Sequence, residues 1–287
     1  MNRAYTNGLK VVVQQKAGPF LLDLFPDADA AFSLRRLRTD YTGAAIRVRR
    51  SSDNAEQDIG FRVNGDLNTS ALLAFVGSGD GLVTKLYKQD ESSFSIDLSQ
   101  TDFQDQPYIV IGGQLVVNPD NGLPAIRATR DFDSGSDHKL VGSQGMADNF
   151  NYQNGSVFSV TKSLISGRNT AYGWTASFNT NLRVGLGIDN NGNLIFRNNT
   201  EGRFGNDSVT AQTALFYQRG GTGTVNNLSP NLTTGGDASS LPTPFALLKF
   251  STVACEHLFQ EIVLWNFNQD ANRDDIVSHV NTYYNVY

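Results

Sequence analysis

Cysteine and histidine are nearly absent from this sequence. Its 287 residues include one cysteine, Cys255, and three histidines. A single cysteine cannot close an intrachain disulfide or build a multi-cysteine metal site, and so few histidines argue against a histidine-rich metal centre. We therefore expect Cys255 to be an inert, buried thiol, and we expect the protein to need no metal and no other cofactor.

Long apolar runs are missing as well. No segment approaches the roughly 20 apolar residues that cross a bilayer, and the first residues lead into no apolar signal core. The formal net charge of −5 opposes the basic field that binding to nucleic acid requires. We therefore expect a soluble protein with no membrane insertion and no nucleic-acid partner. The sequence also contains no G-x-S-x-G, P-loop or H-E-x-x-H motif.

Turn-forming residues are abundant. The 27 glycines, together with many Asn, Ser and Thr residues, indicate short strands joined by turns. The chain is long enough for one large β-sandwich. The polar stretch 220–240 is predicted to be a loop, because strands resume immediately after it. We expect one β-sandwich domain over residues 21–287, preceded by an N-terminal extension or edge strand over residues 1–20.

Alternation of apolar and polar residues predicts most of the strands. The clearest hairpin surrounds Asn191-Gly192, a dipeptide that supplies the left-handed backbone of a tight turn. Leu258–Trp265 carries apolar side chains on both faces, which predicts a central strand covered on both sides. The other expected strands are Leu82–Lys88, Tyr108–Ile111, Leu115–Val117, Ala125–Ala128, Ser156–Lys162, Leu182–Ile188, Asn193–Arg197, Ala214–Gln218 and Ala246–Phe250.

Helices are expected in three places. The first begins at Asp27 or Asp29, either of which can cap it, and ends at Leu37. The second is Ser70–Val76, with Gly77 past its end. The third runs from Ala271 to about Tyr284, and the apolar stripe along it consists of Ile276, Val277, Val280, Tyr283 and Tyr284.

Arginines cluster in and around the predicted strand Ala45–Arg50. The strand alternates apolar residues with Arg47 and Arg49, so these two side chains share a face. The arginines could meet phosphates or an acidic partner, or they could be solvated and paired with neighbouring acids. We predict a protein interface at Arg47, Arg49 and Arg50. The acids available to pair with the arginines of this region are Asp40, Asp53, Glu56 and Asp58.

Candidate ligand sites are few. Tyr172 and Trp174 could stack on a sugar ring, although core packing explains them as well. Glu261 is the strongest candidate for a glycosidase acid, although a structural acid would look the same. The alternating carboxylates of 131–137 could begin a calcium loop, but a polar turn explains them too. The segment 189–193 fits the hairpin turn better than a metal loop. We therefore predict carbohydrate contact at Tyr172 and Trp174, with no catalytic residue and no metal site.

Ala30–Gly60, with the sequence AAFSLRRLRTDYTGAAIRVRRSSDNAEQDIG, resembles a module of phage virion proteins. Matches continue at 72–77, at 132–137 and from Glu261 to Asn285. These proteins resemble concanavalin-A-like jelly rolls and are distantly similar to the catalytic domain of fungal α-L-arabinofuranosidases. Leu86–Glu91 departs from the family's aromatic-rich segment. The segment Leu186–Leu194, which is similar to the region of the enzymes' nucleophile, contains no Glu.

This resemblance implies an all-β, concanavalin-A-like jelly-roll β-sandwich with short peripheral helices and a C-terminal helix. It also implies a non-enzymatic structural protein of the virion, located on the capsid or tail and made in the host cytoplasm. The implied partners are other virion proteins, and a homotrimer is the expected assembly. The alternatives are an adhesin that binds a host-surface glycan and a glycoside hydrolase of arabinofuranosidase type.

Overall fold

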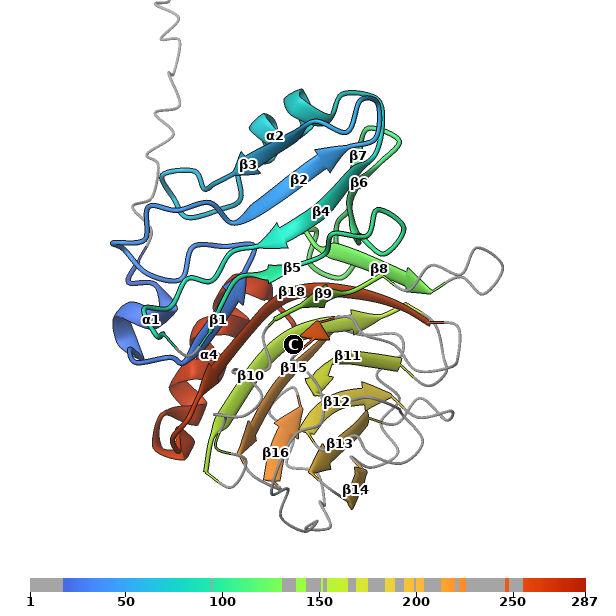
Figure 1. The fold of residues 1–287 in the computed structure, drawn as a ribbon. Helices are drawn as coiled ribbons and strands as arrows, with labels where there is room; N and C mark the ends of the chain where they lie inside the picture. The colour runs from blue at the N-terminus through green and yellow to red at the C-terminus, as the bar shows by residue number, and fades with distance from the viewer. Residues whose placement is uncertain are drawn as a thin grey trace, which may run out of the picture.

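The computed structural model of this chain is an antiparallel β-structure with a few helices (Figure 1). The helical elements are α1 (Leu21–Leu24), α2 (Thr69–Val76), the 3₁₀ turn η1 (Asp270–Asn272) and α4 (Arg273–Tyr284). The residues that the structure describes are 18–93, 95–130, 138–142, 151, 154–164, 169–174, 184–188, 194–198, 200–203, 213–219, 222–225, 246–247 and 255–287.

Most of the strands are short and lie within a few residues of the predicted ranges. They are β1 (Ala30–Ser33), β2 (Ile46–Arg50), β3 (Glu56–Ile59), β4 (Gly81–Leu86), β5 (Leu98–Ser99), β6 (Tyr108–Ile111), β7 (Gln114–Leu115), β8 (Ile126–Arg130), β9 (Leu140–Val141), β10 (Ser156–Ser163), β11 (Asn169–Trp174), β12 (Val184–Ile188), β13 (Leu194–Asn198), β14 (Thr200–Arg203), β15 (Thr213–Arg219), β16 (Thr222–Val225), β17 (Ala246–Leu247) and β18 (Cys255–Trp265).

The strands form two ladders that meet at β4. One ladder follows the order β16–β15–β10–β18–β8–β6–β4, and the other follows β14–β13–β12–β11–β17–β9–β5–β4. Strand β18 has β10 along one edge, while β1 and β8 share its other edge. β11 approaches β18 without pairing with it. This arrangement confirms the predicted all-β sandwich with short peripheral helices and a C-terminal helix.

β18 separates two apolar clusters, as expected for a central strand. On one face, Ile262 and Leu264 belong to the cluster shared with β1, β2 and β4. On the other face, Val263 and Trp265 pack with α1 and α4. The alternation is interrupted between Phe259 and Glu261, where the pairing with β10 shifts register. This bulge turns Phe259 to the same cluster as Ile262 and Leu264, an irregularity that uniform alternation does not predict.

The predicted helix from Asp27 or Asp29 to Leu37 is wrong. Residues Ala30–Ser33 form β1, which pairs antiparallel with β18 and is buried along its whole length. A strand covered on both faces shows no alternation, so its apolar spacing can resemble that of a helix. The helix in this region is α1, four residues long, in which Asp23 accepts a hydrogen bond from the backbone N–H of Phe20 at 2.9 Å.

The other two predicted helices are confirmed. α2 is capped by the Asn68 side chain, which accepts from the N–H of Ala71, and it ends at Gly77. In α4 the predicted stripe is buried against β10 and β18, with Tyr283 partly buried at its rim. The predicted hairpin is present as the β12–β13 pair, although its turn, 189–193, lies outside the described residues. No helix in the described ranges is long and apolar enough to span a bilayer.

His257 makes the stability of the fold sensitive to acid. Burial on β18 lowers the pKa of His257 from 6.5 to about 4. Between these pH values His257 is protonated in the unfolded chain but stays neutral in the folded chain. The free energy of unfolding therefore falls as the pH drops from 6.5 to 4. We expect His257 to account for a loss of up to about 3 kcal/mol over this range.

This pH dependence can be measured by denaturant unfolding at pH 7.5 and at pH 4.5. Because the His257→Gln variant has no titratable group at this position, its stability should change less between the two pH values than that of the parent. An equal change in both proteins would show that groups other than His257 cause the acid sensitivity.

Candidate functional site

Glu261 is held inside the protein by four hydrogen bonds from three side chains. Arg35 donates Nε to Oε2 at 2.7 Å and Nη2 to Oε1 at 2.8 Å. The hydroxyls of Ser33 and Tyr284 donate to Oε2 at 2.8 and 3.0 Å. Glu261 is fully buried. The predicted glycosidase acid is therefore a structural carboxylate that joins β18 to β1 and α4, consistent with the alternative stated for it above.

Arg35, the partner of Glu261, also stacks on the tyrosines of α4. Its guanidinium carbon lies 4.6 Å from the ring centre of Tyr283 and 5.2 Å from that of Tyr284. Burial by itself lowers the pKa of Arg35, but the charge and hydrogen bonds of Glu261 outweigh this effect, and the net shift is upward. Arg35 is therefore a fixed cation whose charge Glu261 already balances.

A pocket of about 620 Å³ lies next to this ion pair, and Arg35 is part of its lining. We call it the α4 pocket. It is an open pocket bordered by the last turns of α4, by residues 64–66 of the turn at 62–66 and by the segment that precedes α1. The side chains that line it belong to Phe20, Arg35, Arg36, Asn64, Asp66, His279, Thr282 and Tyr283.

Hydrogen bonds fix the walls of the α4 pocket. The Tyr283 hydroxyl donates to Asp66 Oδ1 at 2.9 Å, and Asn64 Nδ2 donates to Asp66 Oδ2 at 2.5 Å. His279 Nε2 lies 3.0 Å from the carbonyl oxygen of Pro19. Burial, followed by the neighbouring Asp66, raises the pKa of Tyr283, so the phenol stays protonated at neutral pH. No sequence motif marked these residues, because they come from three separate segments of the chain.

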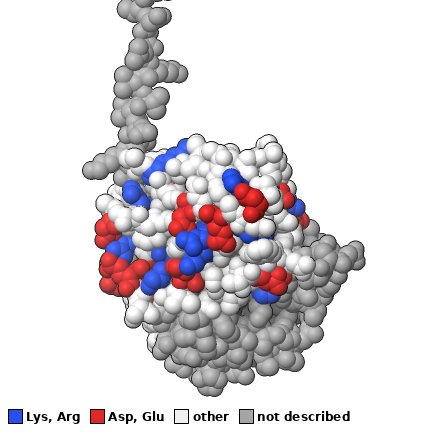
Figure 2. All heavy atoms as spheres, turned by 45° about the horizontal axis from the view of Figure 1, so that its top comes forward, with Lys and Arg blue, Asp and Glu red and all other residues white. Residues whose placement is uncertain are grey.

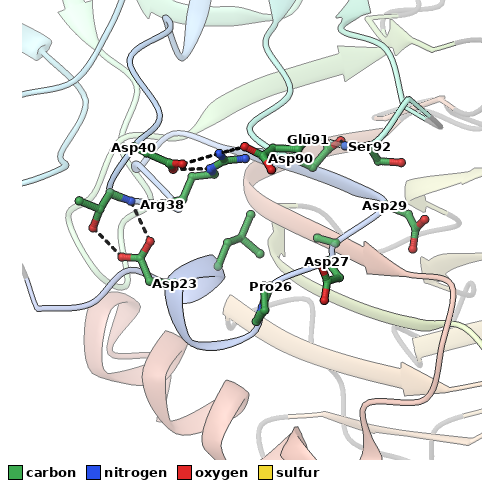
Figure 3. Close-up of a pocket in the computed structure, with 12 residues that line it drawn as sticks. Asp23, Pro26, Asp27, Asp29, Arg38, Asp40, Asp90, Glu91 and Ser92 are labelled. Atoms are coloured by element: carbon green, nitrogen blue, oxygen red, sulfur yellow. Dashed lines mark hydrogen bonds and ion pairs between the residues drawn. The ribbon is translucent and has the colours of Figure 1, made fainter.

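A second pocket, of about 520 Å³, lies beside α1 and is mainly acidic (Figure 3). Arg38 forms a bidentate pair with Asp40, at 2.6 and 2.7 Å, and also contacts Glu91. Asp23 accepts hydrogen bonds from the backbone and hydroxyl of Thr39 at 2.9 and 2.7 Å. Its other acidic lining residues are Asp27, Asp29 and Asp90.

The acids of this second pocket show no arrangement suited to a metal. In the part of the chain that the structure describes, no three His, Cys, Asp or Glu side chains are placed to hold an ion. The hydrogen bond from Arg38 lowers the pKa of Asp40, and the carboxylate of Asp90 is buried and bound by Ser95 and by the N–H of Ala31. Figure 3 shows Arg38 between Asp40 and Glu91. Much of the negative charge in this pocket is therefore already paired or hydrogen-bonded within the protein.

Gln89 and Asp90 tie β1 and the loop after it to the end of β4. Gln89 Nε2 donates to the carbonyl oxygens of Ser33 and Arg35, each at 3.0 Å, and Gln89 Oε1 accepts the N–H of Leu37 at 2.8 Å. Asp90 accepts the N–H of Ala31 at 3.0 Å. These two residues hold the loop that presents Arg35 and Arg36. Sequence reasoning missed them because their partners are backbone groups more than fifty positions away.

The arginines of β2 differ in their surroundings. Arg47 pairs with Asp58 at 2.7 Å, and Arg50 pairs with Asp53 at 2.7 Å. Arg49 is only 6% exposed and bonds to Gln106, so it is not accessible at the interface predicted for Arg47, Arg49 and Arg50. A register shift in the pairing of β2 with β4, between Arg47 and Val48, accompanies this difference. Figure 2 shows acidic and basic groups interleaved on this side of the molecule.

The predicted carbohydrate contacts lie on β11. Tyr172 pairs with Leu186 of β12 and Leu247 of β17, and Trp174 pairs with Val184. The two residues lie two positions apart on one strand and so share a face, but their side chains are outside the described part of the structure. The candidate calcium segment 131–137 is outside it as well, and so is the side chain of Cys255.

Solved structures with the same fold include arabinofuranosidases. An arabinofuranosidase complexed with arabinofuranosyl-α-1,2-xylobiose matches with a TM-score of 0.60 and 14% identity, over 90% of this chain and 63% of that one. A GH54 α-L-arabinofuranosidase mutant soaked with 4-nitrophenyl α-L-arabinofuranoside matches with a TM-score of 0.59 and the same identity and coverage. This chain thus spans less than two thirds of their length. No family model and no curated protein matches the sequence. The predicted distant similarity is confirmed at the level of fold.

Proposed function

We propose that this chain is a component of a phage particle that binds carbohydrate without hydrolysing it. Carbohydrate binding rests on one observation, the fold shared over 90% of the chain with an arabinofuranosidase that holds an arabinofuranosyl-xylobiose. A fold can host many functions, so the site itself has to be tested. This proposal joins the predicted virion role with the predicted glycan-binding alternative.

The surroundings of two glutamates support a non-hydrolytic role. Glycoside hydrolysis needs two carboxyl groups about 5 to 9.5 Å apart on either side of the scissile bond. Glu261 is fully buried and bonded to Arg35, and Glu256 is partly buried and paired with Arg127. Neither lines the α4 pocket or the acidic pocket beside α1. Among the acids that do line the pocket beside α1, Asp40 and Glu91 are paired with Arg38, and Asp90 is bonded to Ser95 and to the N–H of Ala31.

The virion part of the proposal rests on the resemblance of Ala30–Gly60 and the C-terminal segment to phage virion proteins. Other virion proteins and further copies of this chain, as a homotrimer, are the proposed partners. Arg47 and Arg50 are the partly exposed arginines of the proposed interface. A cryo-EM map of the intact particle tests this placement, and density for the protein on the capsid or tail is the expected result.

Binding can be tested on a glycan array that includes arabinoxylan fragments and bacterial surface polysaccharides. We expect the protein to bind at least one class of glycan, and soluble glycan of that class should compete with the binding. Heat-denatured protein serves as the control for adhesion through exposed apolar surface. A failure to bind any glycan at high protein concentration would refute the proposed function.

Hydrolysis can be tested with 4-nitrophenyl α-L-arabinofuranoside. We expect no release of 4-nitrophenol above the uncatalysed background, whereas a GH54 α-L-arabinofuranosidase in parallel should release it. Release that scales with the amount of folded protein would show that the chain is an enzyme. In that case the Glu261→Gln variant would test whether this buried acid contributes to hydrolysis.

A further inference from the structure

We propose that the α4 pocket is a carbohydrate site and that it takes a saccharide carrying a carboxylate group. This inference rests on the proposed function, and it adds a location and a chemical class of ligand. The pocket volume of about 620 Å³ lies within the range of about 300 to 1,000 Å³ typical of ligand pockets. Its lining combines aromatic rings with convergent polar groups, which is the composition such sites use.

Arg36 supplies the charge that selects an acidic ligand. Its neighbour Arg35 also lines the pocket, but Glu261 already balances that charge. Within the described ranges Arg36 forms no ion pair, and the one hydrogen bond recorded for its side chain is to the carbonyl oxygen of Val63 at 3.3 Å. A guanidinium has five N–H donors in a planar fork that matches a carboxylate. A carboxylate bound at Arg36 would therefore meet a cation that is not in an ion pair, since Asp66, the acid in the lining, is bonded to Tyr283 and Asn64 instead.

Phe20 sets the orientation of this guanidinium. The guanidinium carbon of Arg36 lies 4.5 Å from the centre of the Phe20 ring. Gly65 also lies against this ring: it has φ of +92°, and a Cβ at this position would lie 2.5 Å from Phe20. Only glycine lets the turn approach Phe20 this closely. The cation is therefore held by packing before any ligand arrives, which reduces the entropy lost on binding.

Tyr283 supplies a fixed aromatic surface for a sugar ring. Its hydroxyl is bonded to Asp66, and its ring stands edge-on to Tyr284 with centroids 4.8 Å apart. Sugar rings present apolar C–H faces that pack on such rings, while their hydroxyls need donors and acceptors nearby. Asp66 and Thr282 line the same pocket and carry acceptor oxygens. The pocket thus offers a ring surface, hydroxyl partners and a cation within one cavity.

The test compares acidic and neutral glycans on the full chain and on variants of the pocket. The array should carry glycans with uronic or sialic acids and their neutral counterparts. We expect the protein to prefer the acidic members. Arg36→Gln should weaken their binding by about 10- to 100-fold, the usual value of a charge-assisted hydrogen-bonded contact. Tyr283→Leu should weaken acidic and neutral glycans alike, because it removes the ring surface.

Arg62→Gln is the matched control, because Arg62 lies on the same turn, is exposed, and bonds to Thr69 and Ser70 rather than lining the pocket. Binding should be unchanged in this variant. Circular dichroism reports whether each variant folds. If a pocket variant does not fold, hydrogen exchange of the parent protein with and without the array-selected glycan decides the matter, since slower exchange is expected at residues 62–66 and at the end of α4.

Different failures have different meanings. If the protein binds no glycan, both the proposed function and this site are refuted. If glycan binding persists in Arg36→Gln and Tyr283→Leu, or if exchange slows only elsewhere, the function stands and the α4 pocket is not its site. If neutral glycans bind as well as acidic ones and Arg36→Gln has no effect, the assignment of a carboxylate-bearing ligand is wrong.

Discussion

Glu261→Ala is expected to lower the free energy of unfolding by about 3–5 kcal/mol, the usual cost of removing one partner of a buried ion pair. The variant leaves the guanidinium of Arg35 buried without a counter-charge, and it removes the acceptor for Ser33 and Tyr284. Because the Glu261 carboxylate links β1, β18 and α4, its loss should lower the stability of all three elements together. Denaturant unfolding of the variant and its parent measures the difference.

Glu256→Ala is the matched control for this experiment. Glu256 lies on the same strand, and its ion pair with Arg127 is partly exposed, with side-chain exposures of 20% and 38%. Exposed pairs typically contribute about 0–1 kcal/mol. A second variant, Arg35→Met with Glu261→Leu, removes both charges and should recover part of the loss. Equal destabilisation by Glu261→Ala and Glu256→Ala would show that the buried pair of Arg35 and Glu261 contributes no more to stability than the partly exposed pair of Arg127 and Glu256.

Gln89→Ala should be nearly as damaging, although Gln89 is uncharged. The substitution deletes three side-chain hydrogen bonds and leaves the N–H of Leu37 and the carbonyl oxygens of Ser33 and Arg35 without this partner. Each buried polar group that loses its partner costs about 1–3 kcal/mol. We therefore expect a loss of at least about 3 kcal/mol in the free energy of unfolding.

The loss should have a local signature as well. The amide of Leu37 donates to Gln89 Oε1, so its hydrogen exchange should accelerate more than that of amides in α2. Gln57→Ala is the control, because Gln57 is exposed on the edge strand β3, and a change within about 0.5 kcal/mol is expected there. Unchanged exchange at Leu37 in Gln89→Ala would mean that the loop has another anchor.

Local patterns in the sequence predict much of the fold. The short apolar run Tyr108–Ile111 and the helix end at Gly77 identify β6 and α2 almost to the residue, because both depend on neighbouring positions only. β1 was missed for the opposite reason. Its burial depends on pairing with β18, in which Ala31 lies opposite Val263. The residues Ala30–Ser33 alone do not indicate that β18 is the partner strand.

The candidate site was harder to predict from the sequence than the fold was. Arg36, Asp66 and Tyr283 meet only because α4 packs beside the turn at 62–66, and no motif links three segments so far apart. The sequence did single out Glu261, but it could not show that Arg35 binds this residue. The local signals at the α4 pocket were the apolar stripe that includes Tyr283 and the dipeptide Asn64-Gly65, which is typical of turns.

The pairing of β1 with β18 has a consequence for how the chain is made. Arg35 and Glu261 are separated by 226 positions. At a synthesis rate of about 5–20 residues per second, β1 leaves the ribosome roughly 10 to 45 seconds before its partner strand exists. During that interval the apolar residues Ala30–Phe32 have no β18 to cover them. Folding of this end of the molecule is therefore completed only after β18 has been synthesised, and chaperones that shield nascent chains should raise the yield of folded protein.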